Sequence, residues 1–248
     1  MAYYKFDEQS GDLGFDYSDI ENEGGYVGAP SNNSQGLFNF AFSPPSSNSY
    51  FSIASNIYTN QTNTVAYSMW VNLAANNSSD AVLLNKDSGI YGGSFYLKYI
   101  NSTKKFQGNI CGTTINTTDT SPTGYWNHIV LQSNSKKVNL YVNGVLQAEG
   151  FCNNAYTGIA ANTSSITVGG DGTTSLNGKI DEFKIFKNFF TDYQVKLIFN
   201  YLPDYPDYGN TPIAWYKLEY PNNGSSQTAP DATGNNNTLT ITNVNYTG

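Results

Sequence analysis

The chain has 248 residues, of which 39% are hydrophobic, 15% are aromatic and only 12% are charged, and its formal net charge is -7. This content can fill a buried core, and the length suits one large β domain or two small ones. The acidic balance argues against nucleic acid and anionic membranes as main partners, because both require clustered Lys and Arg. The sequence has no apolar run of about 18 residues, so it predicts no membrane insertion.

Few charges leave a surface of neutral polar residues, which suits neutral partners such as sugars. The opening MAYYKFDEQSG lacks the basic and apolar regions of a signal peptide. We expect the protein to be extracellular, at a cell surface or at a virion surface. It would reach that location after removal of a leader or by another route.

Short segments of alternating or β-branched residues recur along the chain, and they are predicted strands. The clearest lie at 65–73, 94–100 and 126–132, separated by turn-forming clusters of Asn, Gly, Ser and Thr. This spacing predicts an all-β protein, an antiparallel sandwich of two sheets.

The segment KKVNLYVNGVLQAEG predicts a β-hairpin. Val138, Leu140 and Val142 alternate with polar residues before Asn143-Gly144, the pair preferred in a tight type I′ turn. On either side lie the only cysteines of the chain, Cys111 and Cys152. They predict a single disulfide, with two unrelated free thiols as the alternative.

One short helix is predicted near residue 191. Thr191 and Gln194 form a capping box, and apolar residues follow at helical spacing until Pro203. We expect this helix to lie across one end of the sandwich. Three prolines and a glycine then make residues 203–212 a predicted linker.

The opening strand pattern occurs twice, because Ala2-Tyr3-Tyr4-Lys5-Phe6 aligns with Ala214-Trp215-Tyr216-Lys217-Leu218. Residues 213–248 therefore form a candidate second unit. A unit this short cannot bury its own aromatic face.

The chain resembles the laminin-G-like, concanavalin A-like jelly-roll family, in its pentraxin-like branch, in order from about residue 2 to 202. The segments that carry the resemblance are AYYKFDEQSGDLGFDYSD, YSMWVNL, GYWNHIVLQSNSKKVNLYVNG and ITVGGDGTTSLNGKIDEFKIFKNFFTDYQVKLI. It implies a two-sheet jelly roll over 1–202, whose opening strand pairs near the closing Gly-Lys-Ile-Asp-Glu-Phe strand.

Residues 213–248 resemble the first hairpin of a second such module, with an acidic turn at 231–234 and a strand at 238–241. Three explanations remain open. The natural chain continues as a tandem array, or these residues complete a sheet in this domain, or they complete one in a neighbouring copy.

The same resemblance implies a calcium site where the acidic opening turn meets the Ile-Asp-Glu strand. Its candidate ligands are Asp16 and Asp181, helped by backbone oxygens near Asp19, which stands where the family has glycine. The alternative is that these carboxylates are solvated or only hydrogen-bonded.

Catalysis finds little support in the sequence. Asp181 and Glu182 are adjacent, so they should point to opposite faces of a strand, whereas paired glycosidase acids share a face. His128 is the only histidine and is expected to be structural. Tyr91 and Tyr156, in Gly- or Asn-rich loops, are candidates for stacking on sugar rings, or they are simply surface tyrosines.

These features predict a non-catalytic recognition module that binds glycans or a protein partner, with calcium as its candidate cofactor. The rival is a structural subunit of a fibre, appendage or virion that self-assembles through its repeated strand. The fold class alone does not choose between them.

Overall fold

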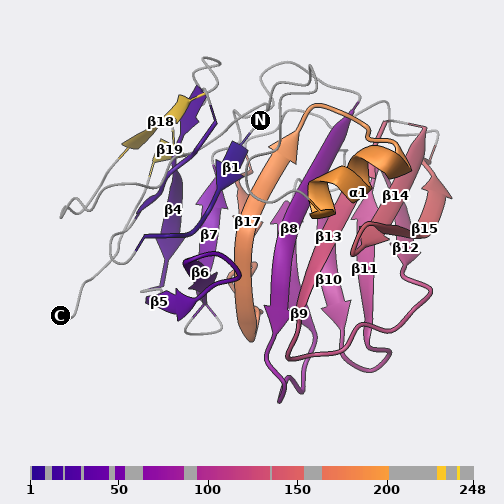
Figure 1. Ribbon diagram of the computed structural model, residues 1–248, viewed down its shortest axis with the longest axis horizontal. Helices are drawn as coiled ribbons and strands as arrows, with labels where there is room; N and C mark the ends of the chain where they lie inside the picture. Colours follow the sequence, from indigo (N-terminus) through magenta and orange to yellow (C-terminus); the bar gives the residue numbers. More distant parts are fainter. Residues whose placement is uncertain are drawn as a thin grey trace.

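The computed structural model describes residues 2–8, 13–18, 20–28, 31–44, 48–53, 64–86, 94–134, 136–153, 164–200, 228–232 and 239–240. Two large antiparallel sheets stack face to face (Figure 1), and a small third sheet lies at one side. The predicted all-β sandwich is confirmed.

We name the two large sheets A and B. Sheet A has the strand order β15 (Val145–Phe151), β14 (Lys137–Val142), β13 (Trp126–Ser133), β8 (Val65–Leu73), β17 (Gly178–Phe186), β6 (Phe40–Ser43) and β5 (Ser31–Gln35), and β1 (Ala2–Tyr4) also pairs with β17. Sheet B has the order β12 (Thr113–Asn116), β11 (Lys105–Ile110), β10 (Phe95–Ile100), β9 (Ala81–Lys86), β16 (Ile166–Val168), β7 (Tyr50–Ile53), β4 (Gly24–Val27) and β2 (Leu13–Gly14).

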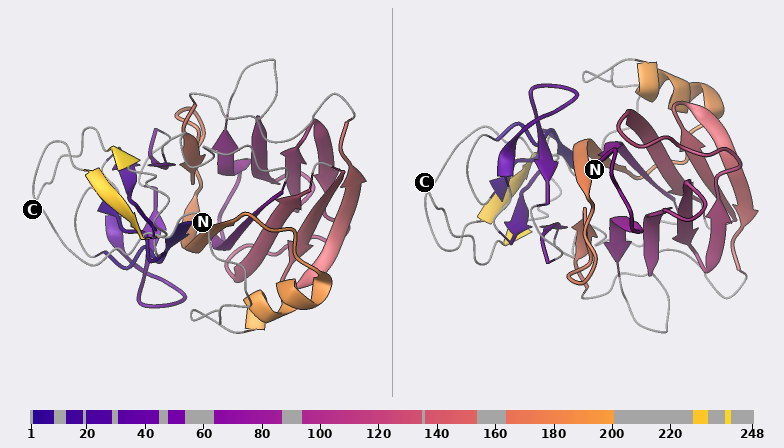
Figure 2. Two further views of the ribbon diagram at one scale, coloured as in Figure 1. Left: turned by 90° about the horizontal axis from the view of Figure 1, so that it is seen from above. Right: turned by 90° about the horizontal axis from the view of Figure 1, so that it is seen from below.

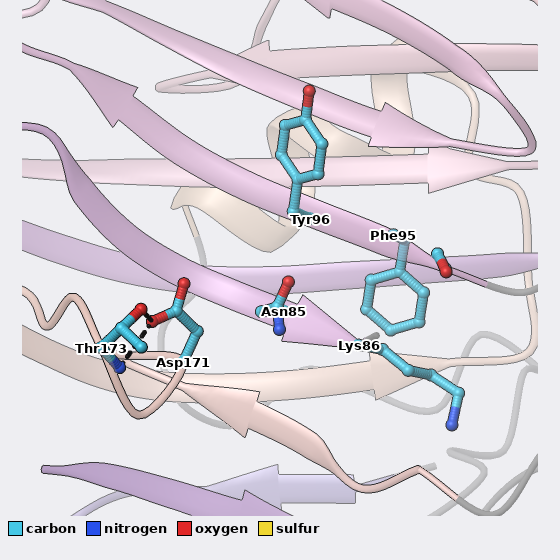
Figure 3. Close-up of a pocket in the computed structure, with 7 residues that line it drawn as sticks. Asn85, Lys86, Phe95, Tyr96, Asp171 and Thr173 are labelled. Carbon is cyan, nitrogen blue, oxygen red and sulfur yellow. Dashed lines mark hydrogen bonds between the residues drawn. The ribbon is translucent and has the colours of Figure 1, made fainter. Parts of the chain in front are cut away.

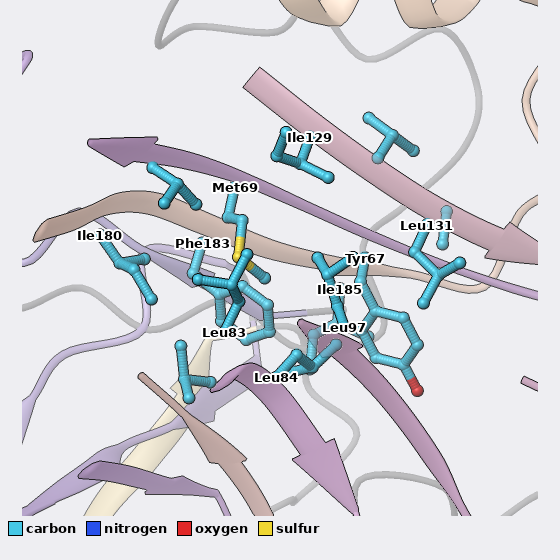
Figure 4. Packing of buried hydrophobic residues seen from close by; sticks show 14 of the residues in the cluster. Tyr67, Met69, Leu83, Leu84, Leu97, Ile129, Leu131, Ile180, Phe183 and Ile185 are labelled. Atoms are coloured by element: carbon cyan, nitrogen blue, oxygen red, sulfur yellow. The ribbon is translucent and has the colours of Figure 1, made fainter. Parts of the chain in front are cut away.

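The core lies between the two sheets. Tyr67 and Met69 of β8 extend toward Leu84 and Leu97 of sheet B (Figure 4), and all four are buried. At Gly108 a Cβ atom would lie 2.7 Å from Leu131 Cδ1, closer than side chains tolerate. Glycine at this position therefore permits the close approach of β11 to sheet A.

The first strand closes the domain against its last one. Tyr4 of β1 is opposite Phe183 of β17, and their rings stack with centroids 5.9 Å apart. This is the pairing expected for the opening and closing segments. The two ends of the domain therefore meet in the middle of sheet A.

The predicted hairpin is present between β14 and β15. Asn143 and Gly144 both have positive φ angles, 51° and 76°, as a type I′ turn requires. The Asn143 side chain also accepts a hydrogen bond of 2.8 Å from the backbone N–H of His128.

Cys111 and Cys152 are joined by a disulfide across 41 positions of the sequence. Cys111 follows β11 of sheet B, and Cys152 follows β15 of sheet A. The bond therefore ties the two sheets together on the side of the sandwich formed by β12 and β15.

The helix α1 (Asp192–Asn200) begins at the predicted capping box. The Thr191 N–H donates to Gln194 Oε1 at 2.9 Å, and the Gln194 N–H donates to Thr191 Oγ1 at 3.3 Å. Its position differs from the expected one, because α1 lies over the outer face of sheet A (Figure 2). There Phe199 covers Trp70, with ring centroids 5.5 Å apart, and this cover keeps an outward-facing aromatic residue of β8 out of water.

The third sheet joins the two ends of the sequence. It has the order β19 (Leu239–Thr240), β18 (Thr228–Ala232) and β3 (Ile20–Asn22), with Asp231 opposite Glu21. Asp231 and Ala232, predicted in a turn, lie instead in β18, because they pair with β3. The linker at 203–212 and the start of the second unit lie outside the described residues, so their assignment stays a prediction.

Candidate functional site

A cavity of about 450 Å³ opens on sheet B (Figure 3). It lies over the ends of β9 and β10 and beside the loop that follows β16. Its lining residues are Asn85, Lys86, Ser94, Phe95, Tyr96, Asp171 and Thr173.

Tyr96 is the aromatic ring that β10 turns outward. The strand alternates strictly, with Phe95, Leu97 and Tyr99 buried in the core and Tyr96 and Lys98 half-exposed. The Tyr96 hydroxyl donates to Gln107 Oε1 at 3.2 Å, and the Lys98 ammonium lies 4.8 Å from the ring centroid. These two contacts hold the ring at the cavity.

Asp171 brings the one carboxylate among the lining residues to the edge of the cavity. Its Oδ1 atom accepts the N–H and hydroxyl of Thr173, at 3.0 and 2.7 Å, and the N–H of Thr174 at 2.8 Å. Partial burial favours the neutral form, but these donors, together with Lys98, outweigh it and lower the pKa of Asp171. The carboxylate is ionised, and Oδ2 can accept a further hydrogen bond.

Lys86 closes the cavity near the core. The residue is buried, its amine donates to the Ser164 carbonyl, and burial lowers its pKa to about 8. Phe95 and the methylene chain of Lys86 form the less polar side of the cavity, whereas Asn85 and Thr173 offer an amide and a hydroxyl. The arrangement can hydrogen-bond a neutral polyhydroxy molecule and stack on one of its faces.

The structure places the two predicted calcium ligands among different partners. Asp16 Oδ1 accepts the N–H groups of Tyr3, at 2.8 Å, and Ser18, at 2.9 Å, and Asp16 Oδ2 accepts the Ser18 hydroxyl. Asp181 Oδ2 accepts the N–H groups of Leu37 and Phe38, at 2.9 and 3.1 Å, while Asp181 Oδ1 is buried without a hydrogen bond.

Calcium prefers six to eight oxygen ligands. Within the described ranges, no group of three or more His, Cys, Asp or Glu side chains has the arrangement of a metal site. Asp181 offers calcium one carboxylate oxygen without a hydrogen bond, Oδ1, which is far fewer ligands than the ion prefers. Calcium binding therefore stays a prediction.

Asp181 and Glu182 are both buried in β17, away from the cavity. Glu182 has a φ angle of 54°, and the register against β8 shifts between Asp181 and Lys184, so the pair sits at a β-bulge. Burial, with each carboxylate's acidic neighbours, raises the pKa of both groups. Nothing in their position exposes them to a substrate.

His128 has structural surroundings. It is buried, its Nε2 atom lies 2.8 Å from the Ser68 hydroxyl, and burial lowers its pKa to about 3. Its ring packs against Trp70 and Phe199, under α1. The ring therefore stays neutral and helps to seat the helix.

Tyr91 and Tyr156 lie outside the described residues, so their predicted role stays a prediction. The sequence analysis missed Tyr96, Asn85 and Asp171. An aromatic residue on the polar side of an alternating strand was a visible signal for Tyr96. Nothing in the sequence marked Asp171, because its place depends on how the loop after β16 folds back.

Comparison with solved structures shows what the fold is similar to. Domain 4 of an extracellular arabinanase from Geobacillus stearothermophilus, solved with arabinotriose, is 17% identical with a TM-score of 0.52, and the match covers 79% of this chain and 95% of that one. A structure of botulinum neurotoxin type C, a toxin whose cell entry depends on interaction with two ganglioside molecules, is 16% identical with a TM-score of 0.60. The match covers 81% of this chain and 50% of that one. A Trypanosoma rangeli sialidase is 14% identical with a TM-score of 0.60, covering 80% and 32%.

Identities this low show a shared fold alone. The chain spans half the length of the toxin chain and about a third of the sialidase chain. A search of curated protein sequences finds no match. The only helix in the described part of the chain, α1, has nine residues, and no described helix could cross a membrane.

A sequence profile provides the family. The profile described as the concanavalin A-like lectin/glucanases superfamily, of the laminin G type, matches residues 45–196, which is more than half of the chain. It covers most of the strands of both large sheets, the disulfide and the cavity. The chain belongs to the concanavalin A-like lectin and glucanase superfamily, as its jelly-roll sandwich indicates.

Proposed function

We propose that this protein is a non-catalytic glycan-binding module and that the cavity on sheet B is its binding site. The observation that carries the proposal is the combination of the Tyr96 ring with Asn85, Thr173 and Asp171 around a space of about 450 Å³. An aromatic plane packs against the C–H face of a sugar, and amide, hydroxyl and carboxylate groups pair with its hydroxyls.

The similar folds support the same reading. The arabinanase domain was solved with a trisaccharide, and the toxin depends on gangliosides. A glycan ligand also agrees with a surface that carries few charges. We extend the proposal to a location outside the cell or on a particle surface, where the disulfide would persist.

The cavity lining does not carry the pair of acids that a glycosidase uses. Glycosidases use two carboxyl groups about 5 to 10 Å apart. Of the seven lining residues, Asp171 alone carries a carboxylate, and its Oδ1 atom is engaged within its own turn. The buried pair Asp181 and Glu182 lies on the other sheet.

A direct binding experiment tests the proposal. Wild-type protein and Tyr96→Ala are titrated calorimetrically with neutral mono- and oligosaccharides and with ganglioside headgroups. Loss of the ring is expected to weaken binding about tenfold, equivalent to about 1.4 kcal/mol. Tyr193→Ala is the matched control, because Tyr193 is 70% exposed on α1, which lies over the other sheet. Equal weakening by both variants would contradict the assignment.

Calcium is a second part of the proposal, for Asp16 and Asp181. Melting curves with calcium chloride and with EDTA test it, because a ligand of the folded state raises the melting temperature. The same melting temperature in calcium chloride and in EDTA, for both the wild type and Asp181→Asn, would contradict calcium binding.

Self-association is the second candidate function, and the pairing of β18 with β3 favours it. A strand that joins its own domain along an edge can join the same edge of another copy by exchange. In that case the chain would serve as a structural subunit. Light scattering across a range of concentrations tests this candidate, since exchange requires species larger than a monomer.

A further inference from the structure

The cavity is part of a longer line of polar side chains that crosses sheet B. The strand registers place a series of residues directly opposite one another on successive strands. We name this series the outer row, and its members are Thr167, Asn85, Tyr96, Asn109 and Thr114. Four inter-strand steps of about 4.8 Å give the outer row a length of about 19 Å.

All five members face away from the core. Directly opposite residues share one face of a sheet, and alternation sends their neighbours to the other. Phe95 and Leu97 flank Tyr96 and are buried, and Gly108 and Ile110 flank Asn109 and are buried. The outer-row side chains themselves are half-exposed or exposed. The line is therefore continuous and accessible from β16 to β12.

Hydrogen bonds fix the side chains beyond the cavity. Asn109 Nδ2 donates to Thr114 Oγ1 at 2.7 Å, which orients the amide and leaves its carbonyl oxygen available as an acceptor. Beside the outer row, Gln107 Nε2 donates to Asn116 Oδ1 at 2.9 Å, and Gln107 Oε1 holds the Tyr96 hydroxyl. Side chains that are already ordered lose less entropy when a ligand binds.

The charge along this line selects against an acidic polymer. The outer row has hydroxyl, amide and phenol groups and no ionised side chain. The nearest charges are Lys98 and Asp171, which are opposite in sign and interact with each other, and the buried Lys86, whose amine donates to the Ser164 carbonyl. A polyanion needs repeated cations along its length, and the chain as a whole carries a net charge of -7.

We propose that the ligand is a neutral oligosaccharide chain that lies across the strands along the outer row, with one end in the cavity. This inference rests on the proposed glycan-binding function and specifies its ligand class and direction. Tyr96 stacks on a sugar at the cavity, and Asn109 and Thr114 bind sugars further along the chain. A single sugar would contact only the cavity end.

The experiment uses chain length as its variable. Linear neutral gluco-, xylo- and arabino-oligosaccharides of one to six units are titrated calorimetrically into the full chain, with oligogalacturonides of the same lengths as the acidic series. Affinity for the bound neutral series is expected to rise at least tenfold between two and five units. Asn109→Ala combined with Thr114→Val should weaken binding of the five-unit ligand about tenfold and leave the shortest ligand that binds unchanged.

Tyr96→Ala should weaken short and long ligands alike, and Asn200→Ala on α1 is the matched control for loss of an exposed amide. Circular dichroism verifies that each variant is folded. Equal affinity for short and long ligands, or tighter binding of the acidic series, would overturn the outer row as the site and leave glycan binding standing. Binding of none of these sugars by the folded wild type would count against the proposed function and against this inference with it.

Discussion

The ammonium group of Lys98 lies 4.8 Å from the centroid of the Tyr96 ring. The two residues are two positions apart in β10 and lie on the same face of the strand. This cation–π contact covers part of the ring that borders the cavity. The positive charge of Lys98 therefore helps to position Tyr96, the one outward-facing aromatic ring among the lining residues.

Replacing Lys98 with Met tests that link. A cation–π contact at an exposed site is worth about 0.5–1 kcal/mol, so affinity for a neutral oligosaccharide should fall about two- to fivefold. The measurement is calorimetric titration at two salt concentrations. A loss of much more than tenfold would exceed the contribution of one cation–π contact and would instead identify Lys98 as a direct contact of the sugar.

Glu8 should make stability depend on pH. Burial raises the pKa of Glu8 well above its usual value of 4.5, although Glu8 Oε2 accepts the Tyr26 hydroxyl at 2.8 Å. The unfolded chain ionises first as pH rises, so the stabilisation from the protonated folded form is complete below about pH 4.5 and is lost as pH rises through the folded pKa.

Glu8→Gln removes this dependence. Across the window above pH 4.5, the wild type should lose about 1.4 kcal/mol per pH unit relative to the variant, until the folded pKa is reached. Urea unfolding of both proteins at pH 4, 6 and 8 measures the difference. A constant difference at the three pH values would show that Glu8 titrates normally in the fold.

Removing the disulfide should destabilise the sandwich. The bond closes a loop of 41 positions, for which the chain-entropy estimate is about 4 kcal/mol. Cys111→Ser with Cys152→Ser should therefore melt at a lower temperature than the wild type. Dithiothreitol should lower the melting temperature of the wild type and leave the variant unaffected; the same effect on both would point to a cause other than this bond.

Cross-linking tests the pairing of β18 with β3. Glu21 and Asp231 are directly opposite, and Cα atoms in such pairs lie about 4.5–5.5 Å apart, within the range of a disulfide. Glu21→Cys with Asp231→Cys should form an intramolecular bond under mild oxidation, seen as a monomer of unchanged mass without free thiol. Glu21→Cys with Thr228→Cys is the out-of-register control.

Mixing the two single variants extends the cross-linking test to exchange. A covalent dimer formed between Glu21→Cys chains and Asp231→Cys chains would support self-association through β18. Monomers alone at high concentration would restrict β18 to its own domain.

The elements that the sequence predicted well are those fixed by local chemistry. A type I′ turn requires positive φ at both central positions, which Asn143 and Gly144 adopt readily. The Thr191 and Gln194 side chains satisfy the first N–H groups of α1. Both signals need only neighbouring residues, and both appear in the structure. The closing of β1 on β17 came from the family resemblance and is also present.

The elements that could not be predicted depend on distant partners. Strand β18, with Pro230 in its centre, has no strand pattern and forms beside β3. The bulge at Glu182 depends on its pairing with β8, and Asp171 reaches the cavity only because its loop folds over sheet B. For the same reason, Tyr96 could be placed on one face of β10 but not identified as part of a site.

The pairing of β1 with β17 also determines how the domain would respond to mechanical force. Ala2 is opposite Ile185, so a pull applied at Ala2 and beyond Phe186 opens the antiparallel pair one residue at a time instead of shearing it. Three residue pairs of the sheet resist, together with the hydrogen bonds of Tyr3 to Asp16 and Tyr17, whereas the segment between Cys111 and Cys152 is closed covalently and bears none of this load at first. Under tension, β1 would peel away while the sheet that carries the cavity keeps its shape.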